Sequence, residues 1–176
     1  MWSGTVSVDA NGIVFFDPFV VASWRPNIAI GADLFTEFIT TEVGDEVTRG
    51  GIFLPILAID DAGYDVFVRH SAERSAARGE IVVTNGEFPL HVKQGLVVAD
   101  LAVLRHWDPG VDWQHIPVPA GTYAATIHGF RQVSSKPELV AAGYELVLDA
   151  RSALPPVTGD QSRNMRVNNW WDSPGT

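Results

Sequence analysis

Cysteine is absent from the 176-residue sequence. Its absence excludes disulfide bonds, thiolate nucleophiles, cysteine-ligated zinc and iron–sulfur clusters together. Positive charge is also scarce, because 12 lysines and arginines stand against 21 aspartates and glutamates, for a formal net charge of −9. A generic nucleic-acid-binding protein needs the opposite sign, so we expect no nucleic-acid partner.

Long hydrophobic runs are lacking as well. The longest run spans residues 52–59 and is interrupted by Pro55, whereas a membrane-spanning helix needs roughly 20 apolar residues. Residues 1–6 contain neither the basic nor the apolar region of a secretory signal. We therefore expect a cytoplasmic protein that does not engage a membrane.

Motifs that would define a reaction are missing too. No serine stands in a Gly-x-Ser-x-Gly elbow, and no phosphate-binding loop or dinucleotide fingerprint occurs. The histidines at positions 70, 91 and 128 fall in or beside predicted strands, where we expect a structural or solvent-facing role. We assign no catalytic residue and no cofactor, and we expect a protein that is not an enzyme.

Apolar residues in the sequence mostly alternate with polar ones or form short β-branched runs, separated by 16 glycines and 11 prolines. This pattern predicts a mainly β fold, an antiparallel β-sandwich of roughly ten strands with one or two short helices. We expect residues 1–152 to form a single domain. The tail, residues 153–176, contains the adjacent Trp170 and Trp171, and we expect it to dock on that domain.

Two Asn-Gly pairs, at positions 11–12 and 85–86, give the clearest turn signals. The hairpins they predict join residues 5–8 to 13–16 and residues 80–84 to 88–92. Further strands are expected at residues 19–24, 52–59, 64–69, 96–104, 122–130 and 143–149. Pro55 demands a bulge or an edge position in its strand. Asp33 is the expected N-cap of a helix over residues 33–39, and a second short helix is expected at residues 136–142.

The negative charge is concentrated near the N-terminus. Residues 1–65 contain ten acidic and two basic residues, a net charge of −8, and the remainder of the chain has a net charge of −1. The densest segment has five acids and no base: Asp33, Glu37, Glu42, Asp45 and Glu46. It is either a solvated loop that keeps the protein soluble or a surface that attracts a basic partner. A calcium site is a third interpretation, although the Asp-x-Asp-x-Asp-Gly loop is absent.

A cluster of potential metal ligands lies in a loop-like segment. Two imidazoles and two carboxylates within ten residues could bind zinc or another divalent metal: His106, Asp108, Asp112 and His115. The other interpretation is a polar loop held on the core by Trp107 and Trp113. Tryptophans in loops can also stack on sugars or anchor a protein interface.

One family resemblance is carried by residues 79–131. Its features are the Asn-Gly turn before Phe88-Pro89-Leu90-His91-Val92, a glycine at position 95 before an apolar strand, and Pro119-Ala120-Gly121-Thr122-Tyr123 leading into another strand. This stretch resembles the small β-sandwich proteins related to the competence-associated nuclease inhibitor (ComJ-like) of Gram-positive bacteria. The resemblance implies a role as an inhibitor or immunity protein that neutralises a nuclease or toxin.

These observations lead to two hypotheses of different classes. The first is a non-enzymatic protein-binding module that neutralises a basic toxin or nuclease through an acidic surface. In it, five acids steer the partner and two tryptophans anchor it: Asp33, Glu37, Glu42, Asp45 and Glu46, with Trp107 and Trp113.

The alternative is a β-sandwich that binds a small molecule or carbohydrate, metal-assisted or not. It requires a pocket lined by both tryptophans and by His106 or His115. The sequence does not define the oligomeric state.

Overall fold

The computed structural model describes residues 1–135 and 138–168 of the chain. Nine strands lie in this part: β1 (Trp2–Val8), β2 (Gly12–Phe16), β3 (Phe53–Leu57), β4 (Ala62–His70), β5 (Glu80–Val92), β6 (Leu96–Asp100), β7 (Gln114–Ile116), β8 (Gly121–Val133) and β9 (Leu139–Arg151). Four short helices accompany them: α1 (Pro18–Trp24), α2 (Leu34–Thr40), α3 (Val43–Arg49) and α4 (Ala102–Arg105). None of the helices in this part is long and apolar enough to cross a bilayer.

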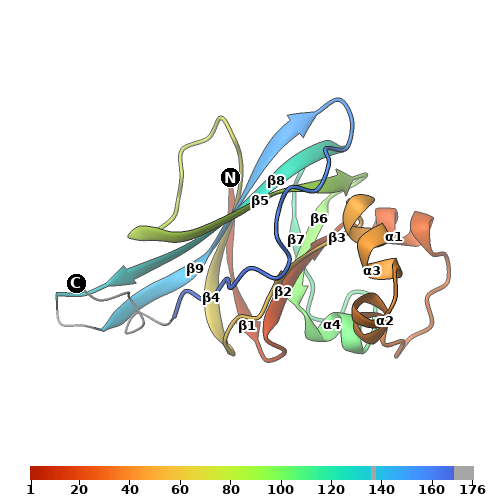
Figure 1. Ribbon diagram of the computed structural model, residues 1–176, viewed down its shortest axis with the longest axis horizontal. Helices are drawn as coiled ribbons and strands as arrows, with labels where there is room; N and C mark the ends of the chain where they lie inside the picture. The colour runs from red at the N-terminus through yellow and green to blue at the C-terminus, as the bar shows by residue number, and fades with distance from the viewer. Residues whose placement is uncertain (136–137, 169–176) are drawn as a thin grey trace.

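The strands form two open sheets (Figure 1). One has five strands in the order β1-β4-β9-β8-β5, and the other has four in the order β3-β2-β6-β7. Neighbouring strands are antiparallel except β4 and β9, which run parallel with Val66 opposite Tyr144. The mainly β prediction is therefore confirmed. The wholly antiparallel arrangement is wrong, because the long connection from β4 to β9 lets the chain return in the same direction.

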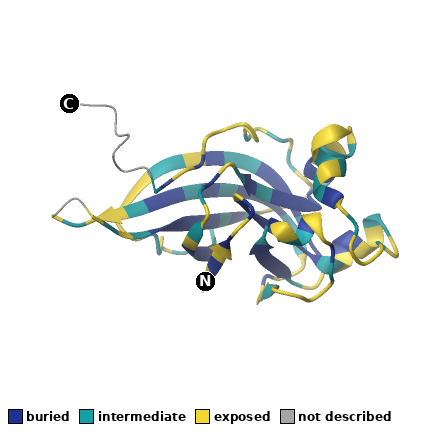
Figure 2. Cartoon of the chain, turned by 90° about the horizontal axis from the view of Figure 1, so that it is seen from below, coloured by how far each residue is buried: buried dark blue, intermediate teal, exposed yellow. Residues whose placement is uncertain are grey.

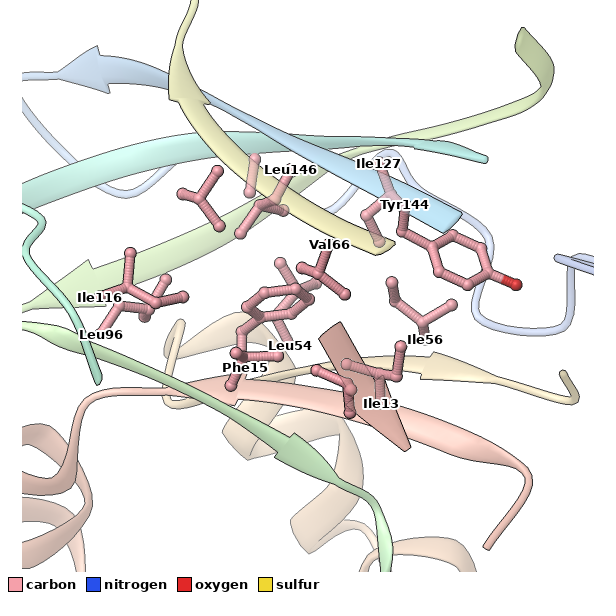
Figure 3. Close-up of a cluster of buried hydrophobic side chains, with 14 of the residues drawn as sticks. Ile13, Phe15, Leu54, Ile56, Val66, Leu96, Ile116, Ile127, Tyr144 and Leu146 are labelled. Atoms are coloured by element: carbon pink, nitrogen blue, oxygen red, sulfur yellow. The ribbon is translucent and has the colours of Figure 1, made fainter. Parts of the chain in front are cut away.

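The main core lies between the two sheets. Side chains from β2, β3, β6 and β7 meet side chains from the five-stranded sheet, and Figure 3 shows Phe15 and Leu54 pointing toward Val66 and Leu146. All five residues of β2 are buried. Because successive side chains of a strand point to opposite faces, β2 must be covered on both sides.

The second side of β2 is covered by the helices, which lie on the outer face of the four-stranded sheet (Figure 1). There Val14 and Phe16 contact a second core built from apolar residues of all four helices and from Trp107. Figure 2 shows that buried residues concentrate on the strands, whereas the helices expose much of their outer surface. The helices therefore form a third layer.

Residues 19–24 form helix α1, and the prediction of a strand there is wrong. Asp17 caps the helix by accepting a 2.7 Å bond from the Phe19 N–H, and Pro18 occupies the first helical position. That Asp-Pro pair is a helix-start signal that outweighs the local β-branched composition. Asp17 is fully buried, and its other oxygen accepts bonds from the backbone N–H groups of Lys93 (2.6 Å) and Gln94 (2.8 Å).

Helix α2 is capped as predicted, whereas α3 and α4 were not predicted. The Asp33 carboxylate accepts a 2.8 Å bond from the Thr36 N–H. Helix α3 contains Gly44, where a Cβ atom would lie 2.1 Å from the carbonyl oxygen of Phe38 in α2. Glycine is needed for this close approach, although it weakens the helical signal in the sequence. Strand β6 ends at Asp100 and the four-residue helix α4 begins at Ala102, so the predicted strand 96–104 is wrong after Asp100.

Neither Asn-Gly pair forms the predicted hairpin. Asn11 lies between β1 and β2, which belong to different sheets, and its Nδ2 atom donates to the Ile59 carbonyl (3.2 Å). Asn85 lies inside the continuous strand β5, whose register with β8 shifts between Asn85 and Phe88. The side chain of Asn85 binds the backbone of Asp160 at 2.7 and 2.9 Å. Tertiary contacts thus replace the local turn.

Three other expectations concern single elements. Pro55 lies in β3, an edge strand, as predicted. Strands β8 and β9 contain the predicted strands 122–130 and 143–149. The expected helix at residues 136–142 is wrong from Leu139 onward, where β9 begins, and positions 136–137 lie outside the described residues.

Residues 153–168 run back over the body of the protein. Gly159 lies against the ring of Phe88, Met165 and Val167 are buried in the main core, and the Tyr144 hydroxyl donates to the Met165 carbonyl at 2.8 Å. This segment therefore completes the core. Trp170 and Trp171, which motivated the expectation of docking, lie outside the described residues.

Candidate functional site

The five acids singled out in the sequence lie on or beside helices α2 and α3, which we call the acidic helical surface. Asp33 precedes α2 and Glu37 lies within it, whereas Glu42 precedes α3 and Asp45 and Glu46 lie in its first turn. All are exposed except Glu37, which is half-buried. The carboxylates of the acidic helical surface thus come from two consecutive short helices and the residues that precede them.

Two of these carboxylates are engaged within α2 and its neighbour. Asp33 accepts hydrogen bonds from both the hydroxyl (2.7 Å) and the N–H (2.8 Å) of Thr36, and these bonds lower its pKa. Glu37 forms a two-fold ion pair with Arg25, at 2.6 and 2.7 Å, which lowers the pKa of the Glu37 carboxyl and raises that of the Arg25 guanidinium. The charge of Glu37 is therefore largely balanced inside the protein.

The three acids of α3 are more available. Glu42 makes no side-chain capping bond. Asp45 lies 3.6 Å from Arg49 in an exposed i,i+4 pair, an arrangement that contributes little to stability. Glu46 accepts a 3.0 Å bond from the indole N–H of Trp24. The first turn of α3 is thus the least compensated part of the acidic helical surface.

The two tryptophans proposed as anchors belong to the helical core. Trp107 is only 4% exposed, and its ring packs on Phe16 and Phe53 at centroid distances of 5.8 and 6.3 Å. It caps the core and offers no exposed surface to a partner. Trp113 is half-buried, with its ring perpendicular to that of Phe16 at 5.1 Å, and its indole nitrogen is buried without a hydrogen-bond partner.

A second acidic feature lies beside α4. An open cavity of about 770 Å³ is bounded by β1, α4 and the loop that leads into β7. Its lining includes His106, Val111 and Trp113, together with four aspartates: Asp9, Asp100, Asp108 and Asp112. No described residue of the lining is a lysine or arginine. We call this feature the aspartate cavity.

The four carboxylates differ in their bonding. Asp100 accepts from the N–H groups of Ala102, at 2.7 Å, and of Asp9. The side chains of Asp9, Asp108 and Asp112 form no hydrogen bond or ion pair with any residue in the described ranges. These three charges are therefore balanced only by solvent, and a cation in the cavity would be attracted to them.

The metal site considered in the sequence is not assembled. His106, Asp108 and Asp112 do line the aspartate cavity, but His115 does not. His115 is the middle residue of β7, so its side chain points opposite to those of Gln114 and Ile116. Among residues 1–135 and 138–168, no three histidine, aspartate or glutamate side chains come close enough to hold a metal ion.

The role of Asp100 escaped the sequence interpretation, and Asp9 entered it only as one acid among many. They are 91 positions apart and meet because β2 pairs with β6, with Ile13 opposite Asp100. The contact arises from sheet pairing between distant segments. No local motif in the sequence signals it.

The chain was compared with known proteins at three levels. No family model matches it, and no curated protein matches it. Two solved structures are similar. ComJ from Bacillus subtilis, an inhibitor of the DNA-degrading activity of NucA, has a TM-score of 0.47 and 13% identity over 86% of this chain and 96% of its own. The crocagin biosynthetic gene J protein has a TM-score of 0.49 and 14% identity, covering 86% and 99%.

These comparisons confirm the resemblance noted in the sequence as a weak, partial match to a ComJ-like fold. At 13% and 14% identity, this chain has few residues in common with either protein. Neither similarity therefore assigns a role to an individual side chain of this protein.

Proposed function

We propose that the protein is a non-enzymatic binding module that neutralises a basic toxin or nuclease by covering its positively charged surface. The observation that carries this proposal is the aspartate cavity, whose lining has four aspartates and no lysine or arginine among the described residues. A cavity of one sign concentrates its field and attracts groups of the opposite sign. A lysine or arginine of a protein partner fits this chemistry.

The acidic helical surface begins close to the cavity, at Asp33. The segment before α2 is bonded to the segment after α4, through Gly31 N–H to Trp107 carbonyl (2.8 Å) and Trp107 N–H to Ala32 carbonyl (3.0 Å). Asp33 follows this segment directly, and His106 and Asp108 flank the tryptophan. A partner seated over the cavity would therefore also approach the start of α2.

The proposed mechanism is occlusion guided by charge. A nuclease or a toxin that binds phosphate needs a basic active site, and an acidic surface competes with phosphate for it. Complementary charge mainly raises the association rate, and salt screens that effect. The complex should accordingly form fastest at low ionic strength.

The test is capture of a partner followed by assay of its activity. The tagged protein is used to isolate binding proteins from a lysate of its source organism at low and high salt, and each captured protein is assayed for nuclease or toxic activity. We expect one basic protein whose activity the wild type abolishes and whose binding weakens with salt. Capture only of proteins that retain full activity in the complex would overturn the proposal.

Matched variants connect the result to the cavity. The pair Asp108→Asn with Asp112→Asn removes two lining charges, whereas Glu80→Gln with Glu138→Gln removes two exposed charges that do not line the cavity. Both double variants change the net charge equally. Only the first should inhibit more weakly, and equal weakening would mean that net charge alone acts.

A small-molecule binding module is the second candidate function. The cavity volume of about 770 Å³ falls within the range of ligand sites, and Trp113 and His106 line it as that alternative requires. Trp107 and His115 do not. The charge favours a cationic ligand over a neutral sugar. Titrating the protein with spermidine and with glucose, followed by tryptophan fluorescence, compares the two. A saturating response to spermidine in the absence of any protein partner would favour this candidate.

A further inference from the structure

The aspartate cavity has a strand edge as one of its walls. Strand β1 is an outer strand of the five-stranded sheet and pairs only with β4 among the described strands. Thr5, Val6 and Ser7 of β1 line the cavity. The opposite wall includes Gln114 at the start of β7, an outer strand of the other sheet. The cavity therefore lies where two sheet edges come together.

Two hydrogen bonds, one from β1 and one from the residue that follows it, show which backbone groups face this wall. The Thr5 carbonyl accepts a 2.7 Å bond from the Gln114 side chain, and the Asp9 N–H donates to the Asp100 carboxylate. Both partners belong to the four-stranded sheet. In an extended strand the N–H and C=O of one residue point to the same side, and neighbouring residues point to opposite sides. Ser7, between Thr5 and Asp9, thus directs its N–H and C=O away from β4 and toward the cavity.

Backbone N–H and C=O groups in this position are placed to form hydrogen bonds with the backbone of another chain. A free N–H and C=O on an outer strand form the template on which an extended peptide adds as a further strand. The carboxylates of Asp9, Asp108 and Asp112 around the same edge select the side chains such a peptide carries. A small cation would use the carboxylates but would have no use for the paired N–H and C=O of Ser7.

We propose that an extended, basic segment of the protein partner docks in the aspartate cavity by adding to the free edge of β1 at Ser7. One lysine or arginine of that segment then lies among Asp9, Asp108 and Asp112. The docked stretch is short, because the Thr5 carbonyl and the Asp9 N–H are already bonded. This inference rests on the proposed function and identifies the part of the partner that is recognised.

The structure supplies a substitution that removes the docking bond alone. Proline at an outer strand is tolerated where its missing N–H would face away from the sheet. Ser7→Pro therefore removes the N–H offered to a peptide while leaving the ladder with β4 intact, and Ser7→Ala removes the hydroxyl but keeps the N–H. Circular dichroism and thermal unfolding establish that both variants are folded.

The probe is a blocked hexapeptide of alternating arginine and valine, compared with the same peptide methylated on its backbone nitrogens and with spermidine. We expect the unmodified peptide to bind wild type and Ser7→Ala alike. Ser7→Pro should bind it about fivefold to tenfold more weakly, the effect of one hydrogen bond. The response to spermidine, which has no backbone N–H or C=O to pair with Ser7, should not differ among the three proteins. Equal affinity of Ser7→Pro and wild type for the unmodified peptide would overturn the docking mode.

Amide hydrogen exchange gives an independent readout. The Ser7 N–H should exchange rapidly in the free protein and become protected in the peptide complex. Binding without any protection of Ser7 would contradict strand addition. If the captured partner is inhibited equally by wild type and Ser7→Pro but not by the Asp108 and Asp112 variant, the docking mode fails and the proposed function stands. Full inhibition by both variants would refute the docking mode and would exclude the aspartate cavity from inhibition, whereas a captured partner that wild type leaves fully active would refute the proposed function.

Discussion

The backbone N–H of Asp9 donates a hydrogen bond to the side-chain oxygen Oδ2 of Asp100 at the edge of the aspartate cavity. Asp9 follows β1 of the five-stranded sheet, and Asp100 ends β6 of the four-stranded sheet. The contact therefore joins the two sheets where the cavity opens. It also orients Asp100, whose other oxygen accepts from the Ala102 N–H at the start of α4.

Removing two charges from the cavity should slow association. We expect Asp108→Asn with Asp112→Asn to lower the association rate constant with a basic partner by about threefold to tenfold at low salt, because the attracting field weakens. The Glu80→Gln with Glu138→Gln control should change it less. Stopped-flow or surface-based kinetics measures both, and a difference that persists unchanged at high salt would contradict an electrostatic cause.

Charge reversal on α3 tests the acidic helical surface separately. Glu42→Lys, Asp45→Lys and Glu46→Lys together should lower the association rate, and more at low than at high salt. The dissociation rate should change little if these residues only steer the partner. An unchanged association rate would exclude the acidic helical surface from recognition.

Trp107 should matter for stability, since its ring is part of the helical core. Trp107→Ala is expected to cost about 3–5 kcal/mol of unfolding free energy, the range for large-to-small changes of buried aromatic residues. Phe19→Ala, at a side chain that is 50% exposed in α1, should change it by less than about 0.5 kcal/mol. Urea unfolding compares the two. Weakened partner binding by a fully folded Trp107→Ala would restore the anchor role.

Gly159 should tolerate no side chain. A Cβ there would lie 2.2 Å from the ring of Phe88, which is itself only 2% exposed and has no room to turn away. We expect Gly159→Ala to cost about 1–3 kcal/mol through overpacking. Gly110→Ala is the comparison variant, because a Cβ atom there would meet no other atom within 4 Å. Its positive φ of 89° adds backbone strain. Equal unfolding midpoints for Gly159→Ala and wild type would show that residues 153–168 leave the body of the protein in solution.

The buried Glu145 should make stability depend on acid pH. Burial would raise its pKa, but the Ala76 N–H (2.7 Å), the Ser75 hydroxyl (3.0 Å) and the Arg69 guanidinium (3.1 Å) outweigh burial and lower it below the ordinary value of 4.5. The unfolded chain then takes up the proton more readily than the folded protein. The stabilisation is therefore complete above pH 4.5 and is lost as the pH falls through the folded pKa.

The matching variant is Glu145→Gln. It leaves Arg69 without its ion-pair partner at a site where the arginine side chain is only 11% exposed, so we expect a loss of about 3–5 kcal/mol near neutral pH. The difference from wild type should shrink in acid, where wild type is protonated too. Urea unfolding across the acid range measures both curves, and a constant difference would contradict the assigned pKa direction.

Local signals predicted those elements whose structure depends on nearby residues. Capping chemistry predicts the Asp33 cap. The missing N–H of proline predicts the edge position of Pro55. The alternation of apolar and polar residues predicts the long strands β8 and β9. The Asn-Gly pair at Asn11 predicted a hairpin that does not form, because turn propensity does not determine which sheet the next strand joins. Its side chain instead binds Asp61 at 3.0 Å, across that junction.

The candidate site was predictable only in part. The acids of α2 and α3 form one surface because they are close in sequence, and the same proximity suggested a role for Asp108 and Asp112. The cavity itself depends on pairing between distant strands, which brings Asp9 and Asp100 together. Trp107 falls in a loop-like segment, which allows either an anchor for a partner or a contact with the core, and Phe16 and Phe53 from two strands pack on its ring.

Strand β2 is buried on both faces and therefore belongs to both cores. Phe15 contributes to the core between the sheets and Phe16 to the core beneath the helices, so neither core can open without disturbing the other. The helical layer consequently has no melting transition of its own and should share the cooperative unfolding of the whole protein. A surface whose backbone stays rigid until global unfolding loses little backbone conformational entropy when a partner binds, which favours long-lived complexes.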